Sequence, residues 1–163
     1  MLPMTEPDLR ESFINASRRE RTDLALPDDF GALDWGSLDF LGWRDAKLPA
    51  VGYVVGVSAG RLVGVMLREV NGRTRSRPQC SWCEDVLLPN DVVYFNAKRA
   101  GKAGRNGNTV STLVCAGFEC SANARRLPPL PYPGFDLETG RQRRIVELRG
   151  NFENFVQRIK DEK

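Results

Sequence analysis

Histidine is absent from this chain of 163 residues, and its absence excludes several kinds of chemistry. Without an imidazole there is no Ser-His-Asp triad, no Cys-His nucleophile pair and no histidine-based metal catalysis. A transition-metal site would have to use cysteine or carboxylate ligands. The sequence also has no glycine-rich phosphate loop in a strand-to-helix setting. We therefore do not expect an enzyme.

Long hydrophobic runs are absent as well. None approaches the ~20 apolar residues that a membrane span needs, and the first twelve residues have neither a basic n-region nor an apolar h-region. Hydrophobic residues make up 41% and charged residues 28% of the chain, which is typical of one folded globular domain. We expect a monomeric cytoplasmic protein without a membrane partner.

The net charge of +3 conceals an uneven distribution of charge. Residues 1–45 have a net charge of −5, residues 46–130 of +7 and residues 131–163 of +1. A basic middle segment is a candidate surface for an acidic partner. One hypothesis from this split is that the acidic N-terminal segment covers the basic surface within the same molecule.

The hydrophobic pattern predicts an α+β fold, in which antiparallel β-hairpins are flanked by an N-terminal and a C-terminal helix. We divide the chain into a helical segment with a packed loop (1–47), a part with the hairpins and all four cysteines (48–130), and a proline-rich connector with a C-terminal helix (131–163).

The expected elements of the first half are a helix from Thr5 to about Arg21, a packed loop over 28–47, a hairpin of strands 51–57 and 62–68, and a basic loop over 71–79 that holds Arg73, Arg75 and Arg77. Those of the second half are a hairpin over 92–114 with a mobile basic tip at 99–108, a short helix over 121–126, an extended connector over 127–133, and a helix over 139–160.

The four cysteines form two pairs. Cys80 and Cys83 are the ends of a CxxC knuckle, and Cys115 and Cys120 are the ends of a Cx4C pair, with thirty-one residues between the pairs. A tight turn with two intervening residues directs two thiolates at one point, and tetrahedral Zn²⁺ needs four such donors at ~2.3 Å. The order of knuckle, hairpin and a helix that starts at the second pair is that of a treble-clef zinc finger.

Two other interpretations of the cysteines are a redox CxxC with two spare cysteines and a pair of disulfides. The first lacks a thioredoxin-like strand and helix around Cys80, and the second does not suit a cytoplasmic chain. We therefore expect one zinc ion. Four thiolates leave no open coordination position, so the zinc would be structural rather than catalytic.

The cysteine motifs and their flanks resemble a known family. Cys80-Ser-Trp-Cys83, the Val-Tyr-Phe strand, the Lys/Gly/Arg loop and Val114-Cys115-x4-Cys120-Ser-x-Asn resemble the C-terminal zinc-binding domain of FBP-type proteins, over roughly residues 35–126. This family includes the FusB-type fusidic acid resistance proteins. The resemblance implies zinc at Cys80, Cys83, Cys115 and Cys120, binding to translation elongation factor G, and release of that factor from the ribosome.

The candidate partner surface combines basic and aromatic side chains, the usual centres of interfaces. Its residues are Lys98, Arg99, Lys102, Arg105, Arg125 and Arg126, with Trp82, Tyr94 and Phe118. Two partners fit such a surface. One is elongation factor G; the other is RNA, in which case the protein is an RNA-binding zinc module at the ribosome.

Overall fold

The computed structural model describes residues 1–70, 78–85, 87 and 89–161, so Arg73, Arg75 and Arg77 of the expected basic loop lie outside the described residues. The elements are α1 (Glu6–Glu11), α2 (Arg18–Asp23), η1 (Phe30–Ala32), η2 (Trp35–Ser37), β1 (Phe40–Arg44), β2 (Val51–Ser58), β3 (Arg61–Glu69), β4 (Val92–Lys98), α3 (Gly101–Arg105), β5 (Thr109–Cys115), α4 (Cys120–Arg125) and α5 (Leu137–Lys160). None of the helices in this part of the chain has the length and apolar character that a membrane crossing requires.

The five strands form one antiparallel sheet in the order β1-β2-β3-β4-β5. The expected hairpins are present: β2 pairs with β3, and β4 pairs with β5. The edge strand β1 differs from the prediction of a packed loop over 28–47. Its five residues include Gly42, which weakens the strand pattern, and their pairing with β2 holds them in the sheet.

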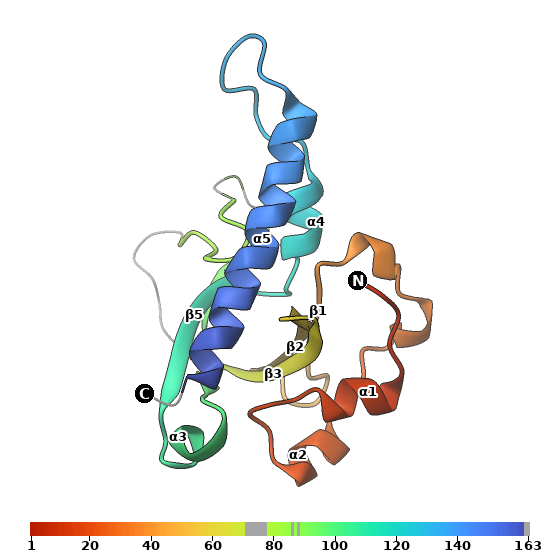
Figure 1. Ribbon diagram of the computed structural model, residues 1–163, viewed down its shortest axis with the longest axis vertical. Coiled ribbons are helices and arrows are strands. Elements are labelled where there is room, and N and C mark those ends of the chain that lie inside the picture. Colours follow the sequence, from red (N-terminus) through yellow and green to blue (C-terminus); the bar gives the residue numbers. More distant parts are fainter. Residues whose placement is uncertain (71–77, 86, 88, 162–163) are drawn as a thin grey trace.

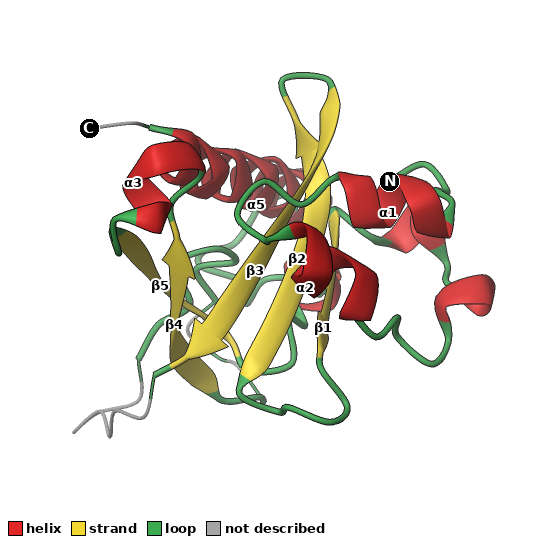
Figure 2. Ribbon diagram, turned by 90° about the horizontal axis from the view of Figure 1, so that it is seen from below, coloured by secondary structure: helices red, strands yellow, loops and turns green. Residues whose placement is uncertain are grey.

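The sheet lies between two layers, as Figures 1 and 2 show. Successive side chains of a strand point to opposite faces, so the sheet builds a core on each side. The helix α5 covers one face, and its apolar side is the predicted one: Ile145, Leu148, Phe152, Phe155, Val156 and Ile159 are all buried. The N-terminal segment covers the other face over β1–β3, where Leu9 and Phe13 pack with Trp43 and Tyr53.

The predicted helix over 5–21 is interrupted. Between α1 and α2 the chain pairs with the sheet: Ile14 donates its N–H to the carbonyl of Gly64 at 3.0 Å, and Gly64 donates to Ser12 at 2.9 Å. A side chain on Gly64 would prevent this approach, since its Cβ would lie 2.6 Å from Ser12 Oγ. A capping box between Ser17 and Glu20 starts α2.

The tip of the second hairpin also differs from the prediction. Residues 101–105 form the short helix α3 rather than a loop without regular structure. Arg99 ties the start of this segment to the end of α5 by donating to the carbonyls of Arg158 at 2.9 Å and Asp161 at 2.8 Å. Ala103 is buried. Tertiary contacts therefore give the segment its helix.

The connector before α5 is an exposed arm. Leu127, Leu130 and Tyr132 are each more than half exposed, and the arm with the first turns of α5 extends beyond the sheet (Figure 1). Side chains from all three predicted parts of the chain meet in one core, where Phe40 contacts Trp82 and Phe152. The division at residues 47 and 130 stays a prediction.

Candidate metal centre

The four cysteines meet at one point beside the sheet. Cys80 and Cys83 lie in the turn before β4, Cys115 ends β5, and Cys120 is the first residue of α4. All four are buried, and their sulfur atoms lie within 4.8 Å of one another. The Sγ atoms of Cys80 and Cys120 are 3.6 Å apart, and those of Cys83 and Cys115 are 3.7 Å apart.

These distances fit a tetrahedral ZnS₄ site. Four sulfur atoms at ~2.3 Å from a tetrahedral Zn²⁺ are about 3.8 Å from one another. The chemistry of the donors fits as well, since thiolates are the usual ligands of structural zinc. The ion would join the turn before β4, the end of β5 and the start of α4. It would supply a rigid crosslink, and with four protein ligands it has no position for a substrate.

The sulfur atoms also accept hydrogen bonds from the surrounding chain. The backbone N–H groups of Trp82 and Cys83 approach Cys80 Sγ at 3.4 and 3.5 Å, and Asn123 Nδ2 approaches Cys115 Sγ at 3.5 Å. Hydrogen bonding with the thiols of Cys115 and Cys120 lowers the pKa of Cys80, whereas the neighbouring sulfurs, Cys115 first, raise the pKa of Cys120. Buried like charges repel, so a cation is needed before all four sulfurs can be thiolates.

The knuckle is held against α5 and β5. Trp82 donates its indole N–H to Thr112 Oγ1 at 3.0 Å. From α5, Asn151 Nδ2 donates to the carbonyl of Trp82 and to Glu84 Oε1, each at 3.0 Å. These contacts orient the two ligands of the knuckle from outside the metal site.

Two aromatic residues of the predicted partner surface belong to the core instead. Trp82 is 1% exposed and packs among aromatic rings of β1 and α5. Phe118 is 6% exposed; it has a positive φ of 62° and turns its ring inward onto the sheet. The prediction that these two side chains contact a partner is therefore wrong. Tyr94, in contrast, is 40% exposed, on the face of β4 opposite to the buried Phe95.

The basic residues do not converge around the zinc site. Val92 pairs with Cys115 at the zinc end of the second hairpin, and Lys98 pairs with Thr109 at the other end, six residues or roughly 20 Å away. Arg99 is bound to the end of α5. Arg125 is in an ion pair with Asp39, and its neighbour Arg126 is exposed.

The structure instead brings Arg18 of α2 close to this distant end of the hairpin, since residues 14–17 and Glu20 line the same cavity as Lys98 and Arg105. Sequence reasoning missed this because the N-terminal segment has a net negative charge. The hypothesis was that this acidic segment covers the basic surface. The segment packs mainly on β1–β3 and borders the predicted basic surface only at Lys98, Arg99 and Arg105. The capping box at Ser17 was the available signal that basic α2 begins there.

Comparison with known proteins agrees with this geometry. A family model described as the FBP C-terminal treble-clef zinc-finger matches residues 8–159. Among solved structures, the fusidic acid resistance protein FusC is similar, with a TM-score of 0.50 and 20% identity over 65% of this chain. The chain spans 47% of the length of FusC. The curated proteins give no significant match. This chain belongs to the FBP C-terminal treble-clef zinc-finger family, and its four cysteines are placed to hold one structural zinc ion.

Proposed function

We propose that this protein binds translation elongation factor G and promotes its release from the ribosome. The family match over residues 8–159 is the observation that carries the proposal, because the FusB-type members that the sequence resembles bind this factor. The similarity to FusC, a fusidic acid resistance protein, supports the same fold. We further propose that the protein acts by binding and not as an enzyme.

The outer face of the second hairpin is the contact surface that we favour. In Figure 2, α1 and α2 lie over β1–β3, and β4 and β5 continue beyond them. Tyr94 and Ser111 are exposed on this face, and the half-buried Leu113 lies directly opposite Tyr94 in the register. An exposed tyrosine beside an apolar side chain is a typical energetic centre of a protein interface.

The zinc site gives this surface its rigidity. It fixes the start of β4 and the end of β5 to α4, so the side chains of the hairpin are ordered before the partner binds. Less conformational entropy is then lost on binding. Removing the metal should therefore weaken the complex even though no ligand to the metal touches the partner.

Titration calorimetry of the zinc-bound protein with purified elongation factor G tests the proposal, and elongation factor Tu serves as the control partner. We expect saturable one-to-one binding to elongation factor G only. Tyr94→Ala should weaken binding at least about tenfold, as expected for an interface centre, and Tyr132→Ala is the matched control in the arm. Equal weak binding to both factors would contradict the proposal.

Release is measured separately. Ribosomes with elongation factor G, GTP and fusidic acid are sedimented with and without the protein. We expect the bound fraction of the factor to fall as the protein is added, and to stay constant when the Tyr94→Ala variant is added at the same concentration. A bound fraction that the wild-type protein leaves unchanged would contradict the release activity but not the binding.

A further inference from the structure

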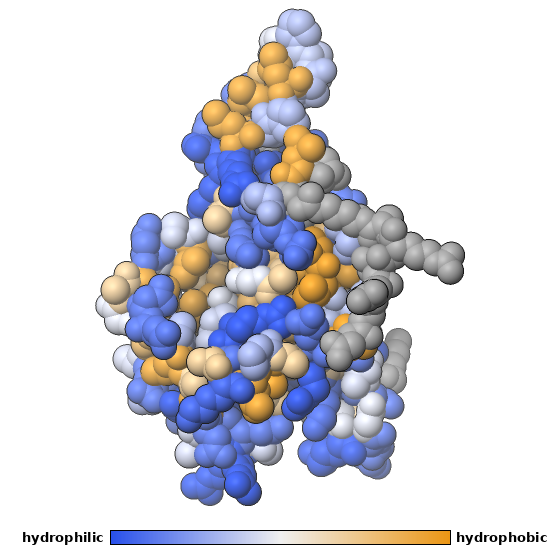
Figure 3. Space-filling model, turned by 180° about the vertical axis from the view of Figure 1, so that it is seen from behind, coloured by the Kyte–Doolittle hydropathy of each residue, from blue (hydrophilic) through white to orange (hydrophobic). Residues whose placement is uncertain are grey.

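A groove separates α2 from α3 at the end of the molecule opposite the arm. Figure 3 shows two hydrophilic projections there with a notch between them. The recess beside α3 has a volume of about 260 Å³ and is lined by residues 14–17, Glu20, Lys98, Arg99 and Arg105 among others. Two parts of the chain that are some 80 residues apart in sequence therefore form one concave surface.

Both walls of the groove are held in place by hydrogen bonds. Asn15 Nδ2 donates to the carbonyls of Met66 at 2.9 Å and Lys98 at 3.0 Å, and Asn15 Oδ1 accepts from the N–H of Met66 at 2.8 Å. This amide fixes the segment before α2 against β3 and the end of β4. On the other wall, Arg99 fixes the segment before α3 to the end of α5. The groove is thus a built feature of the fold.

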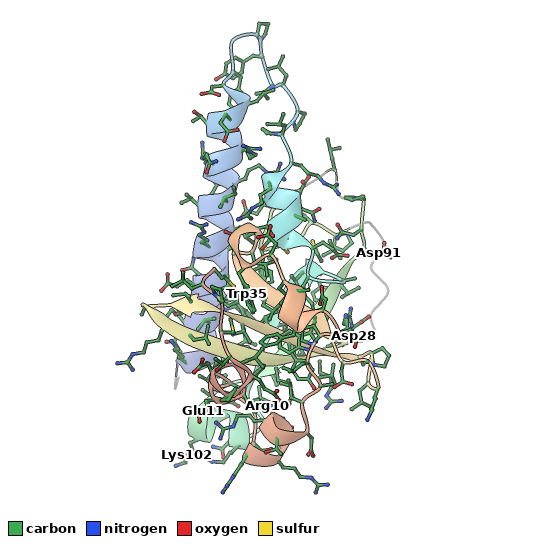
Figure 4. The ribbon with its side chains drawn as sticks, turned by 90° about the vertical axis from the view of Figure 1, so that its right-hand side faces the viewer. Arg10, Glu11, Asp28, Trp35, Asp91 and Lys102 are labelled. Carbon is green, nitrogen blue, oxygen red and sulfur yellow. The ribbon has the colours of Figure 1, made fainter. Side chains whose placement is uncertain are left out.

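Four exposed cations lie in the groove or next to its lining residues in the chain. Lys98 at the end of β4 and Arg105 of α3 line the recess. Arg18 directly follows the lining residue Ser17 at the start of α2, and Lys102 lies on α3 between the lining residues Gly101 and Gly104. Figure 4 shows Lys102 at the outer side of α3. None of the four has an ion pair within 4.0 Å among the residues that the structure describes.

These cations differ from three arginines of α4 and α5. Arg125, Arg144 and Arg149 each have a carboxylate partner within the chain. At the groove the one lining carboxylate is that of Glu20, which accepts a hydrogen bond from the N–H of Ser17 at 2.7 Å in the capping box. Glu20 also interacts electrostatically with Lys98, and four cations against one carboxylate leave this end of the molecule with a net positive charge.

We propose that the groove between α2 and α3 binds the phosphodiester backbone of RNA. Lys98 and Arg105 on the α3 wall, with Arg18 and Lys102 next to the lining residues, can contact successive phosphates and release their counterions. The lining residues include no aromatic side chain that would stack on a base, so the contact should not depend on sequence. This surface is separate from the zinc site and adjoins the Tyr94 face, because Lys98 lies four residues beyond Tyr94 on the same face of β4. The proposal does not rest on binding to elongation factor G.

The probe is a fluorescein-labelled oligouridylate of twelve nucleotides, titrated with the full zinc-bound chain while fluorescence anisotropy is recorded. We expect saturable binding. With three to four phosphate contacts at about 0.7 units of log-log slope each, affinity should fall about 20- to 50-fold between 50 and 200 mM salt. Affinity that does not change with salt would overturn the proposal.

Charge reversals locate the contact. Arg18→Glu, Lys102→Glu and Arg105→Glu should each lower the affinity at 50 mM salt at least about fivefold. The control Arg143→Glu changes the net charge equally on the exposed surface of α5 and should change affinity less than about twofold. If Arg18→Glu behaves like the control, or if Arg143→Glu weakens binding as much as the groove variants do, the groove is not the site.

A substitution that removes a negative charge should have the opposite effect on RNA affinity. Glu20→Gln removes the single carboxylate of the groove and keeps a side chain that can serve in the capping box, so it should tighten RNA binding. Inorganic polyphosphate is the competitor. If it displaces the oligouridylate at a lower phosphate concentration than unlabelled RNA does, the groove is a site for free polyphosphate and the RNA assignment is wrong.

Discussion

Phe118, between the second pair of cysteines, stacks on Phe95 of β4 with the ring centroids 5.2 Å apart. The backbone of the metal-binding turn is thereby tied to the centre of the sheet. The ring lies where side chains of two glycines would otherwise be: a Cβ on Gly42 would lie 2.5 Å from Phe118 Cβ, and a Cβ on Gly52 would lie 2.6 Å from Phe118 Cζ. The two glycines, Gly42 of β1 and Gly52 of β2, thus leave the space that the ring of Phe118 occupies.

Gly52→Ala should therefore destabilise the protein. The new methyl group would overlap Phe118 and lie 3.2 Å from Phe95 Cε1. Overpacking of this kind costs about 1–3 kcal/mol in the free energy of unfolding, which urea denaturation in the presence of zinc would measure.

Gly150→Ala is the matched control. Gly150 lies in α5 with nothing within 4 Å of a built Cβ, and alanine is about 0.5–1 kcal/mol more favourable than glycine inside a helix. The two glycine-to-alanine changes should have opposite signs. A stabilising Gly52→Ala would show that Phe118 does not occupy this space.

Asp39→Asn tests a buried carboxylate that joins three segments. The Asp39 side chain is 1% exposed, and it accepts hydrogen bonds from Arg125 of α4 and from Arg149 Nε of α5 at 2.8 Å. Loss of its charge weakens both bonds, so the free energy of unfolding should fall by about 1–3 kcal/mol. The control Asp23→Asn removes an exposed pair with Arg19 and should change it by less than about 0.5 kcal/mol. If Asp39→Asn and Asp23→Asn lower the free energy of unfolding equally, Asp39 does not have this bridging role.

Much of this architecture could be predicted because it is encoded locally. The two hairpins follow from alternating apolar runs, and the buried face of α5 follows from helical spacing. The ligand set follows from two short cysteine pairs, because each turn determines the directions of its own thiolates. These features depend on neighbours in sequence, and the structure contains them where the pattern indicates.

The features that the sequence did not indicate depend on contacts between distant segments. The pairing of Ser12 and Ile14 with Gly64 interrupts the first helix, and the contact of Arg99 with the end of α5 orders the segment of α3. The spacing of the cysteines predicts the positions of the ligands but not which of the intervening aromatic rings points inward. Trp82 and Phe118 were therefore assigned to the surface although both are buried.

Acid sensitivity should depend on Asp45. Burial alone would raise the pKa of its carboxyl, but the N–H groups of Leu48 and Lys47 and the hydroxyl of Tyr53 bind the charged form and lower the pKa below the ordinary value of 3.8. The folded-state pKa is lowered, so this contribution to stability is full above pH ~4 and is lost as the pH falls through the folded-state pKa.

Unfolding by urea between pH 6 and 2.5 measures this contribution. The wild-type protein should lose more stability on acidification than Asp45→Asn does, and Tyr53→Phe, which lacks one of the three donors, should lie between them. Protonation of the cysteine thiolates is common to all three proteins and cancels in the differences. If the free energy of unfolding falls equally with pH in all three proteins, the acid sensitivity does not come from Asp45.

Removal of the metal should unfold the second hairpin and α4 before the β2–β3 hairpin. The purified protein should contain one zinc ion per chain by elemental analysis, and Cys83→Ser should lose it, because three thiolates hold the ion far less tightly than four. The second hairpin and α4 would then lose their common anchor. We expect faster amide hydrogen exchange over 92–98 and 109–125, and slower exchange retained in the β2–β3 hairpin, which packs against the N-terminal segment as well as α5.

Ser81→Ala is the control for this experiment, since Ser81 lies in the same knuckle but is exposed and is not a ligand. It should keep one zinc per chain and the wild-type exchange pattern. Trp82 connects the metal site to the hairpin: its indole N–H donates to Thr112 of β5, and its ring packs against Phe155 of α5. If the zinc-free protein keeps slow exchange over 109–125, these packing contacts alone hold the hairpin, and the zinc is not required for its fold.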